Sequence, residues 1–224
     1  MLTLVRKKIR LLVENKSPTA SESKALCNER QKLRQYLTLW RKEQFELFPG
    51  LRERIGAFDP SQPELEPLLL PSSLSQPFRT KYGLDNIAKI EYSLREGRAH
   101  DALDDVRKSI KIFNHNLNFK KTFVHGQQPN TRAQAFLRTL TKDKICGAEK
   151  YRSERKALLA LGLPETDQTL QDLQDDQLWS KDSSRPASLG DLCKEDPWFW
   201  HVGRPSGLTE TEDREWDIER KESH

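Results

Sequence analysis

Hydrophobic residues recur at helical spacing in the first fifty residues, and the pattern predicts two helices there. Leu2, Val5, Ile9 and Leu12 share one face of a short N-terminal helix. The sequence Thr19-x-x-Glu22 forms a capping box, so a second helix should begin near Ala20 and end at Pro49-Gly50. The apolar positions of this second helix lie three, four or seven residues apart; they are Leu26, Leu33, Leu37, Trp40 and Leu47.

A third, longer helix is expected over residues 84–117, but its apolar face changes direction. Ile87, Ile90 and Leu94 form one stripe, and the stripe that follows Gly97 points more than a third of a turn away. This second stripe consists of Ala99, Leu103, Val106, Ile110, Phe113 and Leu117. The helix therefore either kinks at Gly97 or is buried on both sides. An unbroken helix packed by two neighbours is preferred, because the flanking residues are good helix formers.

A fourth helix is expected over residues 131–161. Thr131-x-x-Gln134 forms a second capping box, and Gly162 followed by Pro164 is typical of a helix C-terminus. Residues 118–130 should form the preceding loop, so residues 84–162 are predicted to make a long antiparallel hairpin. The apolar side of the fourth helix comprises Phe136, Leu137, Leu140, Ile145, Ala148, Tyr151 and Leu158.

The remaining segments lack a regular period. Residues 56–83 are rich in proline and serine and are expected to be an irregular connector. Residues 163–224 hold four of the five tryptophans, and Thr209-x-x-Glu212 predicts a final helix cut short by the chain end. The predicted fold is all-α: an elongated antiparallel hairpin (84–162), N-terminal helices (1–55) packed beside it, and an irregular, Trp-rich acidic tail (163–224).

Composition supports long amphipathic helices over a compact β-fold. Apolar residues make up 35% and charged residues 32% of the chain, whereas an average globular domain has about 45–50% and about 25%. The net charge of +4 hides an asymmetry, because residues 163–224 carry −9 and residues 106–156 carry +10. This distribution predicts a polyanionic partner or pairing of tail with body, and a solvated helical surface is the plain alternative.

Motifs of the common enzyme and membrane classes do not occur. No stretch approaches the roughly 18–20 apolar residues of a membrane helix, and the N-terminus is unlike a secretory signal. Cys27, Cys146 and Cys193 are far apart and form no CxxC pair, which favours a reducing compartment without structural zinc. We therefore expect an intracellular protein that is not an enzyme and that binds no membrane, cofactor, metal or small-molecule substrate.

Two polar clusters were weighed as catalytic or metal sites. Asp101, Asp104 and Asp105 would need a further carboxylate to hold a catalytic metal ion, so pairing on the helix surface, with Asp104 facing Lys108, is preferred. The second set consists of His100, His115, His125 and His201. These histidines are not spaced from one another or from a cysteine as metal ligands are, so we expect them to bond local backbone groups.

Two other segments could contact a nucleic acid. The helix N-terminus that follows Gly126 could receive a phosphate, with Arg132 and Lys121 near it, but a turn and helix cap explain these residues more simply. Trp198-Phe199-Trp200 could stack on bases, but an aromatic cluster of this kind more often anchors a loop to a helical core.

Four strings of the sequence together resemble one family: IEYSLREGRAHDALDDVR (90–107), FNHNLNFKKTFVHGQQPNTRAQ (113–134), EKYRSERKALLALG (149–162) and KEDPWFWHVGRPSGLTETEDREW (194–216). They resemble the C-terminal helical region of fungal Kyakuja–Dileera–Zisupton (KDZ) transposases and of KDZ transposase-associated proteins. VHGQQPNTRAQ is the most specific part. The cysteine cluster and RNase-H-like core of that family lie outside this chain, so the resemblance implies no catalytic residue. The shared positions are Gly97, Ala99, His100, Asp101, Ala102, Leu103, Gly126, Gln127, Asn130, Thr131, Arg132, Ala133 and Gln134.

In the setting of a transposase, the basic helices are candidates for contact with DNA phosphates. The candidate residues are Arg107, Lys108, Lys111, Lys120, Lys121, Arg132, Arg138, Lys142 and Lys144. The expected function is a non-catalytic helical accessory module of transposase ancestry, nuclear by resemblance, that contacts DNA without sequence specificity. Two alternatives remain: a module that associates with a helical protein partner or with itself, and a truncated transposon remnant without a selected function.

Overall fold

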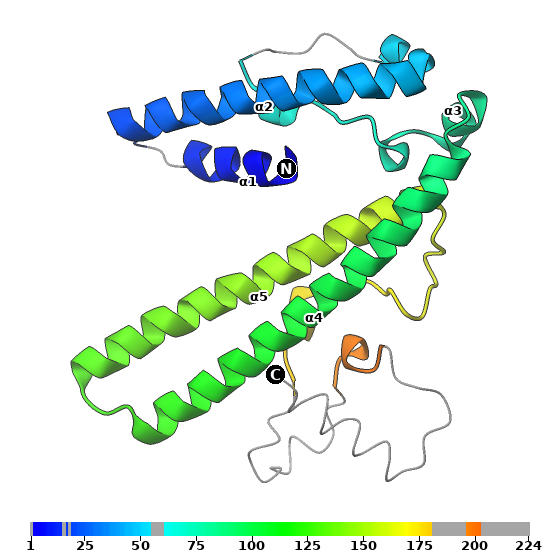
Figure 1. Cartoon of the computed structure of the whole chain (residues 1–224). Coiled ribbons are helices and arrows are strands. Elements are labelled where there is room, and N and C mark those ends of the chain that lie inside the picture. Colours follow the sequence, from blue (N-terminus) through cyan, green and yellow to red (C-terminus); the bar gives the residue numbers. More distant parts are fainter. Residues whose placement is uncertain (1, 15–16, 18, 55–60, 181–195, 203–224) are drawn as a thin grey trace. The chain divides into compact units, whose positions relative to one another are not determined.

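The computed structural model describes residues 2–14, 17, 19–54, 61–180 and 196–202. These residues form an all-α fold, as predicted, and contain no β-strand. The helices are α1 (Leu2–Val13), α2 (Ala20–Leu47), α3 (Gln76–Lys81), α4 (Asp85–Phe123) and α5 (Gln127–Leu161), joined by segments with short 3-10 turns (Figure 1). The chain divides into two compact units, Met1–Asp85 and Asn86–His224, and each is described by itself.

In the first unit, α1 packs on α2 through a small apolar cluster built on Ile9, Leu33 and Leu37. The predicted capping box is confirmed, because Thr19 Oγ1 accepts from the backbone N–H of Glu22 at 3.2 Å and the Glu22 carboxylate accepts from the N–H of Thr19 at 2.7 Å. This pair starts α2 at Ala20. Leu47 was expected on the buried face, but it is exposed at the last position of the helix.

The segment expected to be an irregular connector, 56–83, is organised where the structure describes it. Residues 61–84 contain two 3-10 turns and α3, and leucines of this segment join Leu51 in a second apolar cluster. Side chains of α2 bind its backbone carbonyls: Gln44 Nε2 donates to Leu68 O and Leu69 O, both at 3.1 Å, and Arg41 donates to Pro67 O. Prolines prevent a helix here, and these donors replace the hydrogen bonds that a helix would have made.

In the second unit, α4 and α5 form the predicted antiparallel hairpin (Figure 1). α4 runs unbroken through Gly97, which confirms the prediction of a continuous helix but not of burial on two sides. Ala99, Leu103, Val106 and Ile110 of the second predicted stripe belong to the hairpin core with residues of α5. Phe113 and Leu117 of that stripe are half-buried. The first stripe was expected to be buried on the opposite side, but Ile87, Ile90 and Leu94 are exposed. The apolar face changes direction at Gly97 because only the stripe after Gly97 contributes to the hairpin core.

The loop of the hairpin is much shorter than the predicted 118–130. α4 continues to Phe123 and α5 begins at Gln127, so only residues 124–126 lie between them. The capping box predicted at Thr131 is wrong, because Thr131 lies inside α5 and its hydroxyl donates to Gln127 O at 2.9 Å. Gly126, with φ of 89°, occupies the N-cap position, and Pro129 fits the first turn, where no N–H is needed.

The other end of α5 follows the sequence prediction. Gly162 adopts the left-handed conformation, with φ of 114°, and the N–H of Leu163 donates to Leu158 O at 3.0 Å. This arrangement is a Schellman-type stop, for which glycine is the favoured residue.

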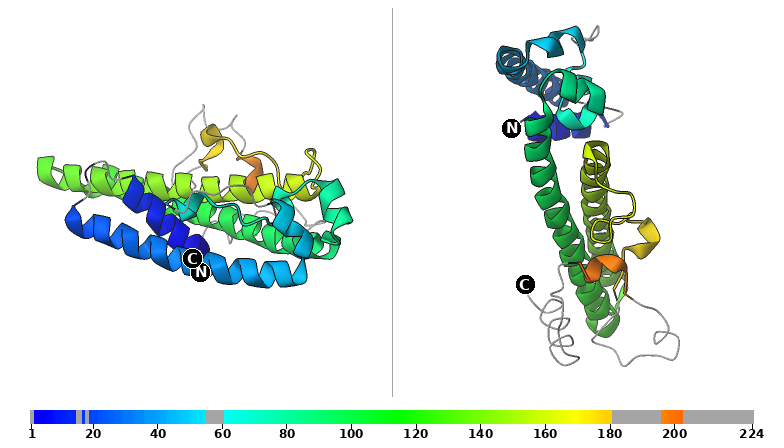
Figure 2. Two further views of the ribbon diagram at one scale, coloured as in Figure 1. Left: turned by 90° about the horizontal axis from the view of Figure 1, so that it is seen from above. Right: turned by 90° about the vertical axis from the view of Figure 1, so that its right-hand side faces the viewer.

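The described tail segments, 163–180 and 196–202, lie along one side of the hairpin (Figure 2). They contain two 3-10 turns and otherwise irregular backbone. Their buried side chains complete the hairpin core; they are Leu163, Leu170, Leu173, Leu178, Phe199 and Trp200. The preferred interpretation of the aromatic cluster as an anchor is confirmed for Phe199 and Trp200. The final helix predicted after Thr209 lies outside the described residues.

Two helical glycines of the hairpin allow a matched test of how closely α4 and α5 approach. A Cβ at Gly147 would lie 3.0 Å from Val106 Cγ2, whereas a Cβ at Gly97 would meet nothing within 4 Å. We expect Gly147→Leu to lower the free energy of unfolding by about 1–3 kcal/mol through overpacking. Gly97→Ala should raise it by up to about 1 kcal/mol, because alanine is the better helix former. Urea unfolding followed by circular dichroism measures both, and stabilisation by Gly147→Leu would contradict the close contact.

Candidate functional site

The positive charge of the second unit is concentrated where α4 turns into α5. Residues 106–142, here called the hairpin end, contain eight Lys and Arg residues and no Asp or Glu. The hairpin end comprises the last part of α4, the short loop and the first part of α5 (Figure 1). It includes every predicted phosphate-binding residue except Lys144.

Arg107 was predicted to contact DNA, but it holds the tail in place. It is 5% exposed, and its Nε donates to Phe199 O at 3.0 Å. Its Nη2 also donates to Phe199 O and to Val202 O at 3.4 Å, and its Nη1 pairs with Asp104. A guanidinium group carries several N–H donors in a fixed geometry and no acceptor. It can therefore donate hydrogen bonds to backbone carbonyls of irregular segments such as the tail. Arg107 is therefore removed from the phosphate-binding set.

Lys144 also binds a backbone carbonyl of the tail. Its Nζ donates to Leu178 O at 2.9 Å and lies 5.2 Å from the centroid of the Phe113 ring. Burial lowers the pKa of this ammonium group, because the protein interior solvates the charged form less well than water does. Lys144 is therefore also removed from the predicted set of phosphate-binding residues.

The remaining candidates lie at the surface of the hairpin end. Lys111 and Lys120 are half-buried, and five residues are exposed: Lys108, Lys121, Arg132, Arg138 and Lys142. Arg138 and Lys142 are four residues apart and so share one face of α5. These side chains lie on the last part of α4 and the first part of α5, at one end of the hairpin.

The hairpin end also exposes apolar side chains that sequence reasoning had not assigned to any function. Ile112, Phe119 and Phe123 follow one another at steps of seven and four residues, which places them on one face of α4. All three are exposed, and the rings of Phe119 and Phe123 lie 5.2 Å apart, tilted by 40°. On α5, Phe136 was expected on the apolar side but is half exposed. The helical spacing of the three α4 residues is visible in the sequence, so their common face could have been predicted from it.

Two of the three aspartates considered as a metal site make ion pairs within the hairpin. Asp104 pairs with Arg107, and Asp105 Oδ2 accepts from Lys150 Nζ at 3.0 Å. The hydrogen bond to Asp105 raises the pKa of Lys150. Within the described residues, no three His, Cys, Asp or Glu side chains converge on a point that could hold a metal ion.

The positions on which the resemblance to KDZ transposases rests fall in two places. Ala99, Ala102 and Leu103 are buried in the hairpin core, with Asp101 exposed beside them. The remaining group, Gly126 to Gln134, forms the N-cap and first turns of α5 at the hairpin end. Arg132 in this group is exposed and remains a candidate for phosphate contact.

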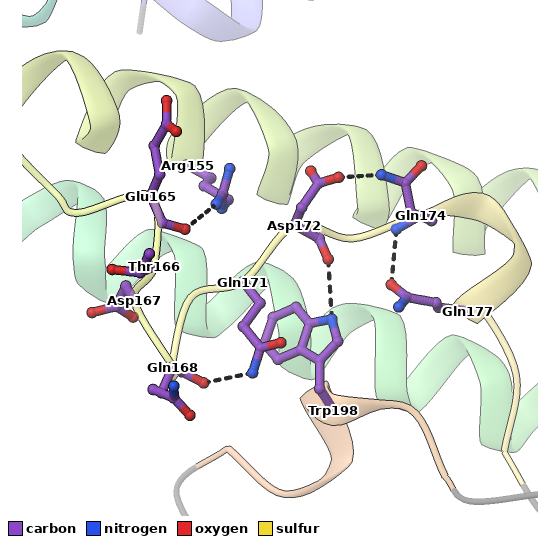
Figure 3. Close-up of a pocket in the computed structure, with 10 residues that line it drawn as sticks. All are labelled: Arg155, Glu165, Thr166, Asp167, Gln168, Gln171, Asp172, Gln174, Gln177 and Trp198. Atoms are coloured by element: carbon purple, nitrogen blue, oxygen red, sulfur yellow. Dashed lines mark hydrogen bonds between the residues drawn. The ribbon is translucent and has the colours of Figure 1, made fainter.

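A pocket of about 450 Å³ lies between α5 and the tail (Figure 3). Many of its polar groups bond to one another: Gln171 Nε2 donates to Gln168 O at 2.9 Å, and Trp198 Nε1 donates to Asp172 O at 3.1 Å. Hydrogen bonds from the Thr169 hydroxyl and the Leu170 N–H lower the pKa of Asp167. These bonds shape the turns of the tail and account for the polar lining without a ligand.

None of the described helices has an apolar stretch long enough to cross a membrane. Comparison of the chain with models of known protein families, with curated proteins and with solved structures gives no match. The resemblance to KDZ transposases therefore stays a prediction that rests on the sequence strings.

Proposed function

We propose that this chain is a non-catalytic helical module that contacts DNA phosphates through the hairpin end. The observation that carries the proposal is the interval 106–142, which has eight basic residues, no acidic ones and five exposed cationic side chains. Lys and Arg contacts to phosphates read no base sequence, so the binding is non-specific. Transposase ancestry and a nuclear location belong to the same proposal and are supported by the resemblance alone.

The proposal predicts DNA binding that weakens steeply with salt. Each phosphate that a cation neutralises releases counterions and adds about −0.9 to the slope of log K against log salt. Removal of Arg138 and Lys142 by the double substitution R138Q/K142Q should make this slope less negative by about 2. Fluorescence anisotropy of a labelled duplex of about 20 base pairs, between about 50 and 200 mM salt, measures it.

Lys42 and Lys156 provide a matched control, because both are exposed and lie outside the hairpin end. The variant K42Q/K156Q removes the same charge and should leave the slope unchanged. An equal effect of the two double variants would show that net charge, and not the hairpin end, binds the duplex. The absence of binding at low salt would overturn the proposal.

A helical protein partner is a second candidate function, favoured by the exposed stripe Ile87, Ile90 and Leu94 on α4. An apolar stripe at helical spacing is the usual surface for another helix. Light scattering over a range of concentrations tests self-association. A mass that rises with concentration and returns to the monomer value in Leu94→Glu would support this function.

A further inference from the structure

We propose that the hairpin end binds single-stranded nucleic acid in preference to duplex, with Phe119 and Phe123 stacking on unpaired bases. The inference rests on the proposed function and narrows it to one class of substrate. It is carried by two features that occur together: exposed aromatic rings and a sequence interval, 106–142, with eight basic residues and no acidic ones.

The two rings are available to a ligand. Phe119 is 53% and Phe123 is 66% exposed, although they touch each other across one turn of α4. They lie on the face of α4 opposite the hairpin core, together with Ile112. Large exposed apolar side chains grouped on one face commonly mark a binding surface.

Two lysines lie between these rings in the sequence, Lys120 half-buried and Lys121 exposed. Phe119 is followed by Lys120 and Lys121, and Phe123 comes two residues later. Surfaces that bind single strands combine aromatic platforms for bases with cations that follow the backbone. In a duplex, neighbouring base pairs cover the faces of the bases, so the phenyl rings would gain nothing there.

The polar residues of the hairpin end favour a nucleic acid over a lipid bilayer. Residues 114–134 contain seven amide side chains: Asn114, Asn116, Asn118, Gln127, Gln128, Asn130 and Gln134. Gln127, Gln128, Asn130 and Gln134 are exposed. Burial of these amides in hydrocarbon would cost them their hydrogen bonds to water. The edges of unpaired bases offer amides both donors and acceptors.

A second copy of this chain is a poorer occupant on grounds of charge. Residues 106–142 carry eight basic and no acidic residues, so pairing two hairpin ends would bring like charges together. A polyanion supplies the complementary charge that the surface lacks.

The test compares three labelled ligands of equal length by anisotropy: an oligothymidine, a duplex and an abasic strand that keeps the phosphates but has no bases. The wild-type protein should bind the oligothymidine about tenfold more tightly than the abasic strand or the duplex. The variant F119L/F123L removes the aromatic faces but keeps apolar side chains. It should lose about tenfold in affinity for the oligothymidine and keep its affinity for the other two ligands.

The variant R138Q/K142Q is the matched comparison, because it should weaken binding to all three ligands through lost phosphate contacts. Circular dichroism should show the same helix content in every variant, since the substituted side chains are exposed. If the duplex binds and F119L/F123L changes nothing, the preference for single strands is wrong and the proposed function stands. If no ligand binds at low salt, both are wrong.

Two further results would overturn the inference by identifying another occupant. The first is binding to vesicles of phosphatidylcholine and phosphatidylserine that F119L/F123L abolishes, with no discrimination between the oligonucleotides. The second is a concentration-dependent dimer, seen by light scattering, that dissociates in the same variant.

Discussion

Replacement of Phe199 by alanine is expected to lower the free energy of unfolding of the second unit by about 3–5 kcal/mol. The ring of Phe199 is 0% exposed and lies 5.4 Å from the ring of Trp200 and 6.0 Å from that of Trp198. Its removal would leave a cavity among side chains of the hairpin core, and surrounding residues fill such cavities only in part. Urea unfolding followed by tryptophan fluorescence gives the change directly.

Phe123→Ala is the matched control for this prediction. It removes the same atoms from a ring that is largely exposed, so the free energy of unfolding should change by less than about 0.5 kcal/mol. Limited proteolysis adds a local measurement, because Phe199→Ala should speed cleavage within the tail segments and Phe123→Ala should not. Similar stabilities of the two variants would mean that the aromatic cluster does not anchor the tail.

Arg107→Met is expected to lower the free energy of unfolding by about 2–4 kcal/mol. Methionine keeps much of the apolar stem but cannot donate, so the carbonyls of Phe199 and Val202 lose their hydrogen bonds to Arg107. A buried acceptor without a donor carries the full cost of its desolvation. Denaturant unfolding measures the change in stability.

Lys108→Met is the comparison for Arg107→Met, because Lys108 is adjacent, equally basic and exposed. Its substitution should leave the free energy of unfolding within about 0.5 kcal/mol of wild type. DNA affinity then separates the two roles: it should fall in Lys108→Met, and Arg107→Met should show no loss under conditions where it is folded. A stable Arg107→Met variant with weakened DNA binding would reverse our assignment of Arg107.

The helices could be predicted because local chemistry fixes most of their ends. Thr19 with Glu22 starts α2, and Gly162 ends α5, in both cases through groups within a few residues of the terminus. The start of α5 was placed four residues too late because Thr131 and Gln134 fit a capping pattern. Gly126 performs that role instead, and proline at position 129 does not interrupt a first turn.

The candidate site was predicted less completely, because charge along a sequence does not reveal the partner. Arg107 and Phe199 are 92 residues apart, and no local pattern connects an arginine in a helix with a carbonyl so distant. Lys144 and Leu178 are 34 residues apart and pose the same difficulty. The exposed stripe that ends in Phe119 and Phe123 differs, since helical periodicity alone places it opposite the core.

The attachment of the tail has a consequence for mutational tolerance. Arg152 Nε donates to Leu173 O at 2.7 Å, Arg155 Nε to Leu170 O at 2.8 Å and the Tyr151 hydroxyl to Gln171 O at 2.6 Å. Each of these bonds ends on a main-chain atom that is the same for every amino acid. The tail can therefore change at positions other than its buried leucines and turn-shaping side chains such as Asp167 and stay attached, whereas a single change in α5 removes one of these donors.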